Sequence, residues 1–585
     1  MASTFFGLNI GKSGLFTYQT GLNTTAHNVA NATTKGYTRQ LIDQSATRAI
    51  RTYNHTGMAG TGVQVNSIYQ VRDAYLDKKF MYNTSLQGEY ANKSYYMTEL
   101  QSYFNEITVT GFTKNFDNFS SALQSLVNDP SNKTTRTQVT QYGENLTEYL
   151  NSLSTNLTMI QEECNTEIKN QVDRINSIAE QICTLNSQIN GVEINGTIAN
   201  DLRDQRQVLI DELSTYVSVE VKEQTVREGS GVSTFEVKIN GQILVDSYDY
   251  NKLKLVPREK LANQNDMPGM YDVVWQNDTA FNALGEDVSG SLKAIIQMRD
   301  GNKEESLSGK VTAAQGTKQV TLTSASIQDV AKLNIPESGY ITIDNRRYQY
   351  ESFILTQGAD GKYQYTFQLT EGLKEAVNNK EVYIGNQVDY KGVPYYMAQL
   401  NEFVRTYTHK YNEICQQGVG ANGDPGVSFF SSTNKAGVEV KFGADYLEYY
   451  KLTCGTVSIN SDVKNNLDKV VTSSDVVNGV ENSDIAKKLL ALQSDRTMFK
   501  QGAPVSFFQT MVAEIGVLAK TAMTLEGNQD DIIADVTKQR LSVSGVDLDE
   551  EAMNLTKYQQ AYRLNSKVIS VMDEVLDRLI NYTGV

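Results

Sequence analysis

The chain has 585 residues, too many for one hydrophobic core, so three or four domains are expected. Apolar residues make up 40% of it and charged residues 21%, which is an ordinary globular balance. The formal net charge of -15 disfavours nucleic acid and anionic lipid as partners. The sequence contains no run of eighteen apolar residues, so no membrane span is expected.

The first residues, MASTFFGLNIGKSG, lack the basic region, long apolar stretch and cleavage site of a secretory signal. The chain is therefore expected to be cytoplasmic or exported by a route that does not read such a signal. Four cysteines, of which Cys164 and Cys183 fall about 28 Å apart on one predicted helix, suggest neither a disulfide framework nor a zinc site. With three histidines in the chain, we expect no cofactor, no metal site, no catalytic residue and no enzyme activity.

The N-terminal segment has helical spacing with apolar residues at intervals of seven. The N-terminal first line is Leu8, Leu15, Leu22 and Val29, and the second line is Tyr18, Thr25 and Ala32. The C-terminal segment from 548 to 579 repeats this spacing. Its first line is Leu548, Leu555, Tyr562, Ile569 and Leu576, and its second line is Tyr558, Asn565, Met572 and Leu579. Lines at heptad spacing predict a seam for another helix, so the two ends are expected to pack together or against copies of themselves.

Between the two ends the period of the pattern changes twice. Residues 146–189 carry apolar positions three and four apart, which predicts a long helix, and 199–217 predicts a helix running back. From about 217 the period becomes two, and the NG at 240–241 predicts a hairpin. A second strand-rich stretch covers roughly 303–388, with DG at 360–361 as another hairpin. Helical spacing returns at 395–418 and again from 483 to the end.

This order predicts a multidomain α+β fold in which the N- and C-terminal helices pair as a coiled coil, next to a long-helix rod domain and inserted β-rich outer domains. The expected division is an inner terminal domain of 1–60 with 541–585, a helical rod of 61–216 with 391–540, a β-rich domain of 217–301 and an inserted β-rich domain of 302–390.

Two motifs are better explained by structure than by chemistry. GLNIGKS at 7–13 has one residue too few between its glycines for a phosphate-binding loop and has no strand before it. Glu550 and Glu551, which follow Asp547 and Asp549, are predicted to complement the exposed amides at a helix start, with Asp547 or Asp549 as the cap, rather than to bind metal.

The segment ANATTKGYTRQ, 30–40, resembles the signature that axial proteins of the bacterial flagellum carry after their first helix. SGVDLDEE followed by YQQAY, within 542–580, resembles the end of the hook-associated protein 1 family, whose members join hook to filament. Further similarity runs through 199–214, 290–300, 398–418 and 481–493. The stretch 303–388 departs from shorter members of the family and resembles an insertion.

The resemblance implies a structural subunit located extracellularly at the hook–filament junction and exported through the flagellar type III pathway. Its implied partners are copies of itself in a ring, the hook protein, the second junction protein and a cytoplasmic chaperone at the C-terminal helix. The first lines would form the subunit-interface seam. The signature turn would be made by Asn31, Thr34, Gly36 and Tyr37, with Gly36 needed for the turn and Tyr37 packed where the layers meet.

Two alternatives remain at this stage. One is the hook protein of the same axial family, which shares the N-terminal signature. The other is an adhesin, or less plausibly a surface enzyme, that uses the inserted β domain.

Overall fold

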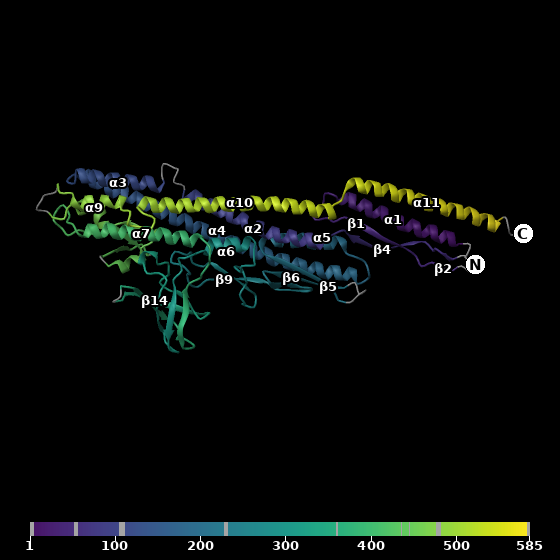
Figure 1. Ribbon diagram of the computed structural model, residues 1–585, viewed down its shortest axis with the longest axis horizontal. Helices are drawn as coiled ribbons and strands as arrows, with labels where there is room; N and C mark the ends of the chain where they lie inside the picture. The colour runs from purple at the N-terminus through teal and green to yellow at the C-terminus, as the bar shows by residue number, and fades with distance from the viewer. Residues whose placement is uncertain are drawn as a thin grey trace.

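The computed structural model describes residues 5–51, 57–104, 111–226, 232–358, 361–434, 436–443, 445–475 and 481–581. The molecule is elongated, with the two chain ends side by side at one end and a small β domain projecting sideways near the other (Figure 1). It is a multidomain α+β protein. Among the helices of the described residues, none combines the length and apolar character needed to cross a lipid bilayer.

The chain ends form a terminal domain of two helices and a β ribbon. Helix α1 (Phe6–Asn31) and helix α11 (Leu548–Asn581) lie against each other as the predicted pair, here called the terminal pair. Antiparallel strands β1 (Gln40–Ala46) and β4 (Val63–Gln70) cover another side of α1, with the short strands β2 (Ile50–Arg51) and β3 (Met58–Ala59) beyond them.

The rod is built from long helices. The predicted helix of 146–189 is confirmed and is longer, since α4 spans Lys133–Glu193 with Asn132 as its cap. The other rod helices are α2 (Ala74–Tyr103), α3 (Phe112–Asn128), α5 (Asn200–Tyr216), α7 (Val393–Gln416), α9 (Asp484–Ala491) and α10 (Pro504–Ser544). The helix expected over 395–418 is thereby confirmed as α7.

Aromatic side chains fill the far end of the rod. Phe112 stacks on Phe508 with ring centroids 4.1 Å apart and meets Phe403 edge to face at 5.1 Å. Short elements close this end: β17 (Phe430–Thr433), β18 (Glu439–Lys441), η2 (Tyr446–Lys451), β19 (Val457–Ile459), α8 (Ser461–Asn465), η3 (Leu467–Lys469) and η4 (Leu492–Ser494).

The first β-rich region lies along the rod as a lateral layer (Figure 1). It contains β5 (Val219–Thr225), β6 (Ser233–Ile239), β7 (Gln242–Asp246), β8 (Asp249–Tyr250), β9 (Leu253–Pro257), β10 (Tyr271–Trp275) and helix α6 (Ser291–Asp300). Asn240 and Gly241 have φ of 47° and 79°, so the predicted NG hairpin is present. The core of this region is continuous with that of the rod.

The second β-rich region, here called the inserted domain, has a core of its own. Its elements are β11 (Ser308–Ala313), β12 (Gln319–Leu322), η1 (Val330–Lys332), β13 (Gly339–Ile343), β14 (Arg346–Gln357), β15 (Tyr363–Leu369) and β16 (Val377–Ile384). The strands follow the order β11-β16-β13-β14-β15-β12, and Lys310 of β11 exchanges two backbone hydrogen bonds with Thr323 beside β12. The antiparallel sheet therefore closes on itself. Asp360 of the predicted DG hairpin lies outside the described residues.

Candidate assembly site at the terminal helices

The contact between α1 and α11 is made by small residues of α1 at heptad spacing. A Cβ placed on Gly7 would lie 2.9 Å from Met572, and one on Gly21 would lie 3.0 Å from Tyr558. A Cβ on Gly14 would lie 2.6 Å from Cγ of Asn565. The two helices are thus antiparallel, and glycine lets their backbones approach more closely than any larger side chain would allow.

The predicted lines take different parts in this contact. The C-terminal second line faces α1 through Tyr558, Asn565 and Met572, and Tyr18 of the N-terminal second line has its ring centroid 6.4 Å from that of Tyr558. Of the first lines, Ile569 also enters this contact, since a Cβ on Gly11 would lie 2.9 Å from its side chain. Leu8, Leu15, Leu22, Tyr562, Ile569 and Leu576 are half-buried, whereas Val29, Leu548 and Leu555 are 45%, 56% and 43% exposed.

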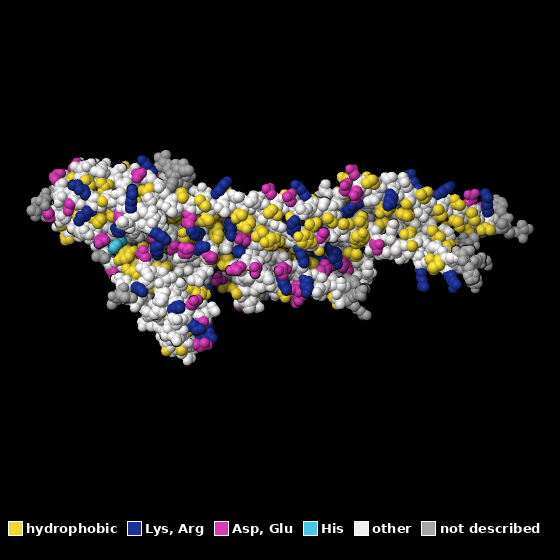
Figure 2. Space-filling model, in the orientation of Figure 1, with side chains coloured by type: hydrophobic (Ala, Val, Ile, Leu, Met, Phe, Trp, Pro, Cys, Tyr) yellow, Lys and Arg dark blue, Asp and Glu magenta, His cyan; other side chains and the backbone are white. Residues whose placement is uncertain are grey.

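A further apolar strip on α11 was not singled out from the sequence. Leu564, Val568, Val571 and Val575 are between 44% and 68% exposed. In helical projection these residues lie on one side of the contact with α1, while Leu548 and Leu555 lie on the other. Apolar side chains are visible along the terminal helices in Figure 2. The terminal pair therefore leaves apolar surface on both flanks of α11.

The signature turn follows the end of α1 at Asn31. The backbone N–H of Thr34 donates to Asn31 O at 2.9 Å, and that of Tyr37 donates to Thr34 O at 3.1 Å. Gly36 has φ of +80°, and a Cβ at this residue would overlap Val208 of α5. Glycine is therefore needed at position 36 both for the left-handed backbone and for close approach to the rod.

Tyr37 and Asn28 lock the turn against the end of α1. The Tyr37 hydroxyl donates to Asn28 Oδ1 at 2.8 Å, and the backbone of Gln40 both donates to and accepts from the Asn28 amide, at 3.0 and 2.9 Å. Burial raises the pKa of Tyr37 well above its usual value, and nearby carboxylates add to this, so the hydroxyl remains a donor. Tyr37 thus lies between the terminal pair and the rod.

Arg39 connects every segment that passes between the terminal domain and the rod. Its backbone N–H donates to Ser544 O at the end of α10, and its carbonyl accepts from Val71 N–H before α2, at 2.8 and 2.9 Å. Its guanidinium pairs with Glu551 at 2.8 Å and with Glu550 at 2.5 Å. Glu551 is buried and also accepts from Asn28 at 3.2 Å. Asp547 accepts from the backbone of Asp549 at 2.9 Å and so is the cap of α11.

Thr38 fixes the turn to α5 through Asp204. The Thr38 backbone N–H and hydroxyl donate to the two oxygens of this carboxylate at 3.0 and 2.6 Å. Burial raises the pKa of Asp204, while these hydrogen bonds and Arg72 act in the opposite direction. We call the set Asn28, Tyr37, Thr38, Arg39, Asp204 and Glu551 the joint.

Sequence reasoning found Tyr37 and Gly36 of this site but missed most of its polar partners. Thr38 and Arg39 stand inside the signature, and Glu551 was assigned only to the helix start. Thr38 and Asp204 are 166 residues apart in the sequence and Arg39 and Glu551 are 512 apart, so spacing gives no signal. The glycines of α1 could have been noticed, because Gly7, Gly14 and Gly21 recur at intervals of seven.

We expect Arg39 and Glu551 to be strongly coupled. In a double-mutant cycle of Arg39→Gln and Glu551→Gln, the coupling free energy should be about 1–3 kcal/mol, because Glu551 is buried and either single change removes one charge of a pair that is largely shielded from water. The measurement is hydrogen exchange of peptides covering α1 in the full chain. Arg578 and Glu574, an exposed pair at 3.3 Å on α11, serve as the control and should couple far more weakly. Equal coupling in the two cycles would contradict the joint.

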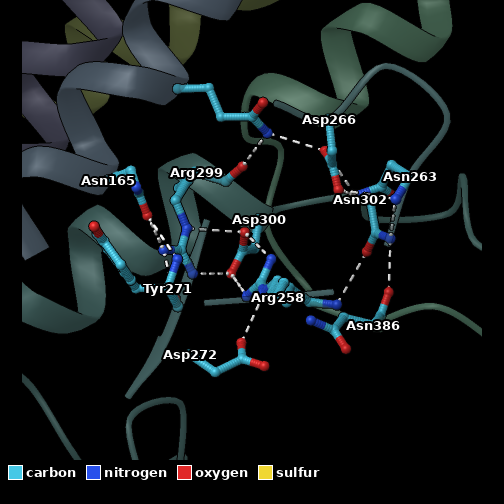
Figure 3. A network of polar contacts seen from close by, with 12 residues as sticks. Asn165, Arg258, Asn263, Asp266, Tyr271, Asp272, Arg299, Asp300, Asn302 and Asn386 are labelled. Atoms are coloured by element: carbon cyan, nitrogen blue, oxygen red, sulfur yellow. Dashed lines mark hydrogen bonds and ion pairs between the residues drawn. The ribbon is translucent and has the colours of Figure 1, made fainter. Parts of the chain in front are cut away.

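A second polar network holds the root of the inserted domain (Figure 3). Asp300 accepts from both Arg258 and Arg299 at 2.7 Å, and these cations keep the pKa of Asp300 low although burial opposes them. Asn302 donates to Asn263 at 2.9 Å and to Asn386 O at 2.7 Å. This network joins α6, the β9–β10 hairpin and both linkers of the inserted domain, which is a structural role.

Nothing in the described residues is arranged for metal chemistry, since no group of three or more His, Cys, Asp or Glu side chains converges there. The four cysteines are free thiols. Burial raises the pKa of Cys164, Cys415 and Cys454, which makes them poor nucleophiles. Cys183 is half-buried, and its thiol donates to Tyr248 O at 2.9 Å.

Comparison with known proteins gives two family matches. Residues 97–334 match the flagellar hook-associated protein FlgK helical domain, and residues 537–581 match the C-terminal region of flagellar basal body rod FlgEFG proteins. The second match contains α11 and the end of α10. The matches define the chain as an axial structural protein of the bacterial flagellum.

Relatives that match over the full length indicate which of the flagellar axial proteins the chain resembles. Flagellar hook-associated protein 1 of Bacillus subtilis is 26% identical over 600 residues, covering 100% of this chain and 99% of that protein. The proteins of the same name from Escherichia coli and Salmonella typhimurium are each 25% identical, over 98% of this chain and 99% of theirs. Over its full length the chain is therefore similar to proteins named flagellar hook-associated protein 1.

Solved structures that are similar to the chain include a flagellar protein. The flagellar hook junction protein FlgK from Burkholderia pseudomallei aligns with 80% of this chain and 100% of that chain, with 14% sequence identity and a TM-score of 0.45.

Proposed function

We propose that the chain is a structural subunit of the junction between the flagellar hook and filament. The observation that carries this proposal is the likeness to hook-associated protein 1 over the whole chain, both terminal helices included. The solved relative that is named a hook junction protein points the same way by its name. The chain would lie outside the cell, between the hook protein and the second junction protein.

Assembly is proposed to proceed through the terminal pair. Its glycine contact holds α1 and α11 together, and the apolar flanks of α11 are left for neighbouring subunits. The first-line residues Leu8, Leu15, Leu22, Val29, Leu548, Leu555, Tyr562, Ile569 and Leu576 remain candidates for this subunit interface. A cytoplasmic export chaperone that covers α11 before export through the flagellar type III pathway would keep its flanks from associating too early.

The two apolar flanks support a ring rather than a two-fold dimer. In a two-fold dimer one patch meets its own copy, whereas two different patches on opposite sides of a helix suit head-to-tail contacts. Here the flank with Leu548 and Leu555 would meet the flank with Leu564, Val568, Val571 and Val575 of the next subunit. Head-to-tail contacts close into rings or continue as helices, and either geometry suits a tube.

The alternatives have no specific feature in their favour. The full-length relatives are hook-associated proteins rather than hook proteins. The inserted domain has a packed core, and among its described residues no group of His, Cys, Asp or Glu side chains could hold a metal ion.

Immunogold electron microscopy of intact flagella tests the proposal, with antibody raised against residues 217–300. We expect one narrow band where hook meets filament. With Leu548→Asp and Leu555→Asp together, the band should be lost, because two charges would enter an apolar subunit contact. Ile569 is left unchanged because it faces Gly11 within the terminal pair.

The matched control is Ile354→Asp, which places a charge on an aliphatic residue that is 58% exposed on β14 of the inserted domain. That variant should keep the band. Label along the whole hook or filament would mean a different member of the axial proteins. Normal bands from the double variant would exclude this flank as a subunit contact.

A further inference from the structure

The inserted domain rests on one face of α7. Gln399, Glu402 and Arg405 lie at spacings of three on that helix and each contacts the inserted domain or its linker. Gln399 Nε2 donates to Glu305 Oε1 in the incoming linker at 2.7 Å. Lys332 of η1 pairs with Glu402 at 3.4 Å, and Arg405 donates to carbonyl oxygens on both sides of Lys332. We call this set the α7 contact.

Two carboxyl groups are buried within the α7 contact with few partners. Glu305 is 7% exposed and Glu402 is 5% exposed. Glu402 reaches Lys332 through Oε1 only, and its Oε2 is buried with no hydrogen-bond partner among the described residues. A buried oxygen without a donor is poorly suited to carry negative charge. The geometry therefore favours a neutral form for part of this pair.

We propose that the α7 contact is pH-sensitive, and that ionisation of both Glu305 and Glu402 loosens the inserted domain from the rod. This inference concerns the inserted domain and does not depend on where the chain is assembled. Under this proposal the inserted domain has two states. It is held firmly against α7 at mildly acidic pH and less firmly at alkaline pH.

The charges that face the two carboxyls come from three elements. The linker contributes Glu304, η1 and its cap contribute Asp329 and Lys332, and α7 contributes Tyr395 and Arg405. Burial raises the pKa of Glu305 to about 7, and the neighbouring Glu402 adds to this while Gln399 and Lys332 oppose it. Burial also raises the pKa of Glu402, with Lys332 and Arg405 opposing.

The sign of the pH effect follows from these directions. A carboxyl whose pKa is higher in the folded state holds its proton more tightly there than in the opened state. Its stabilising effect is complete below its ordinary value of 4.5 and is lost as pH rises toward about 7. Above that pH the loss is complete and stability becomes independent of this group.

Hydrogen exchange of the full chain, corrected for intrinsic rates, tests the proposal between pH 5.5 and 8.5. The reporter is a peptide covering 327–335, and a peptide covering 150–165 in α4 is the internal reference. For the wild type, the opening equilibrium constant of the reporter should rise about thirtyfold over this range. With Glu305→Gln, which keeps a hydrogen-bonding amide but cannot ionise, the rise should fall to about threefold or less.

The matched control is Glu304→Gln at the adjacent, exposed position, which should keep the thirtyfold rise. Glu402→Gln should reduce the rise, because it removes the charge that Glu305 faces. A flat profile for the wild type would overturn the proposal, as would an undiminished rise in both Glu305→Gln and Glu402→Gln. The reference peptide shows whether either variant has disturbed the rod itself.

Discussion

Replacing Arg405 by methionine is expected to destabilise the attachment of the inserted domain by about 3–5 kcal/mol. The guanidinium is fully buried and donates to five oxygens: Leu452 O, Ala331 O, Leu333 O, Tyr450 O and Gln264 Oε1, at 2.5–2.9 Å. None of these oxygens belongs to a carboxylate. Methionine fills a similar space but leaves all five without this donor.

Arginine is the suitable side chain here because its planar fork reaches several carbonyls at once. Burial lowers the pKa of Arg405 to about 10, so the group is still charged at neutral pH and its hydrogen bonds are charge-assisted. Lysine has a single nitrogen and cannot replace these contacts. Arg405→Lys is therefore expected to cost nearly as much as Arg405→Met.

The measurement for Arg405 is local, because a protein of several domains does not unfold in one step. Exchange of peptides covering 327–335 and 446–452 should accelerate by at least a hundredfold in Arg405→Met. Arg347→Met is the control, since Arg347 is exposed on β14, donates to Asn386 at 3.1 Å and lies over the Tyr340 ring, and so has far fewer buried contacts than Arg405. Protection that survives Arg405→Met unchanged would show that the aromatic and linker contacts suffice without the guanidinium.

The long elements could be predicted from the sequence because their hydrophobic period is sustained. Helix α4 and helix α11 carry apolar positions three and four apart over many turns, and the NG at 240–241 requires the positive φ values that a tight hairpin uses. The elements of 40–103 were not assigned from the sequence. Strand β1 alternates little between buried and exposed positions, and α2 buries polar residues such as Asn83 and Glu89 along with apolar ones.

The contact between the terminal helices could be predicted only in part from the sequence. Heptad spacing located the terminal pair, but the more apolar first line contributes Ile569 to the glycine contact, whereas Tyr558, Asn565 and Met572 of the second line make the rest. Leucines at 8, 15 and 22 were the visible signal, yet the closest approach is at Gly7, Gly14 and Gly21, where the absence of a side chain allows it. A line of apolar side chains indicates only that these side chains become buried, either within the chain or between subunits. The contact between α1 and α11 depends instead on how closely their two backbones can approach.

Buried arginines also escape sequence reasoning. Arg136, Arg299 and Arg405 are among the largest fully buried side chains, although arginine is a surface residue by type. Arg136 donates to Pro130 O nearby and to Val470 O more than three hundred residues away. Such a residue is recognised only once the carbonyls around it are placed, and these come from segments with no shared pattern.

Changing Gly11 and Gly14 together to valine should separate α1 from α11 and abolish incorporation into the flagellum. A Cβ on Gly11 would lie 2.9 Å from Ile569, and one on Gly14 would overlap the Asn565 amide, which is held by its bond to Ala561 O at 2.8 Å. Overpacking of this kind costs about 1–3 kcal/mol at each position. The helices must then move apart along their whole contact.

The readouts are the exchange of peptides covering 6–31 and the gold-labelled band at the junction. Gly527→Val is the matched control, because Gly527 also lies within a helix, α10, but has nothing within 4 Å of its would-be Cβ. Valine and glycine differ little in helix propensity, so both the control and the α1 changes are nearly neutral in that respect. Any difference between them therefore comes from the helix contact.

A second substitution that restores the helix contact distinguishes the effect of side-chain packing from that of helix propensity. Gly14→Ala alone should weaken the terminal pair although alanine favours the helix by about 1 kcal/mol, because its methyl group meets Asn565. Adding Asn565→Ala removes the group that is met and should restore both protection of α1 and the junction band. If Gly14→Ala alone strengthened the terminal pair, propensity would outweigh packing. The first-line leucines, not the glycines, would then be the residues that hold the two ends of the chain together.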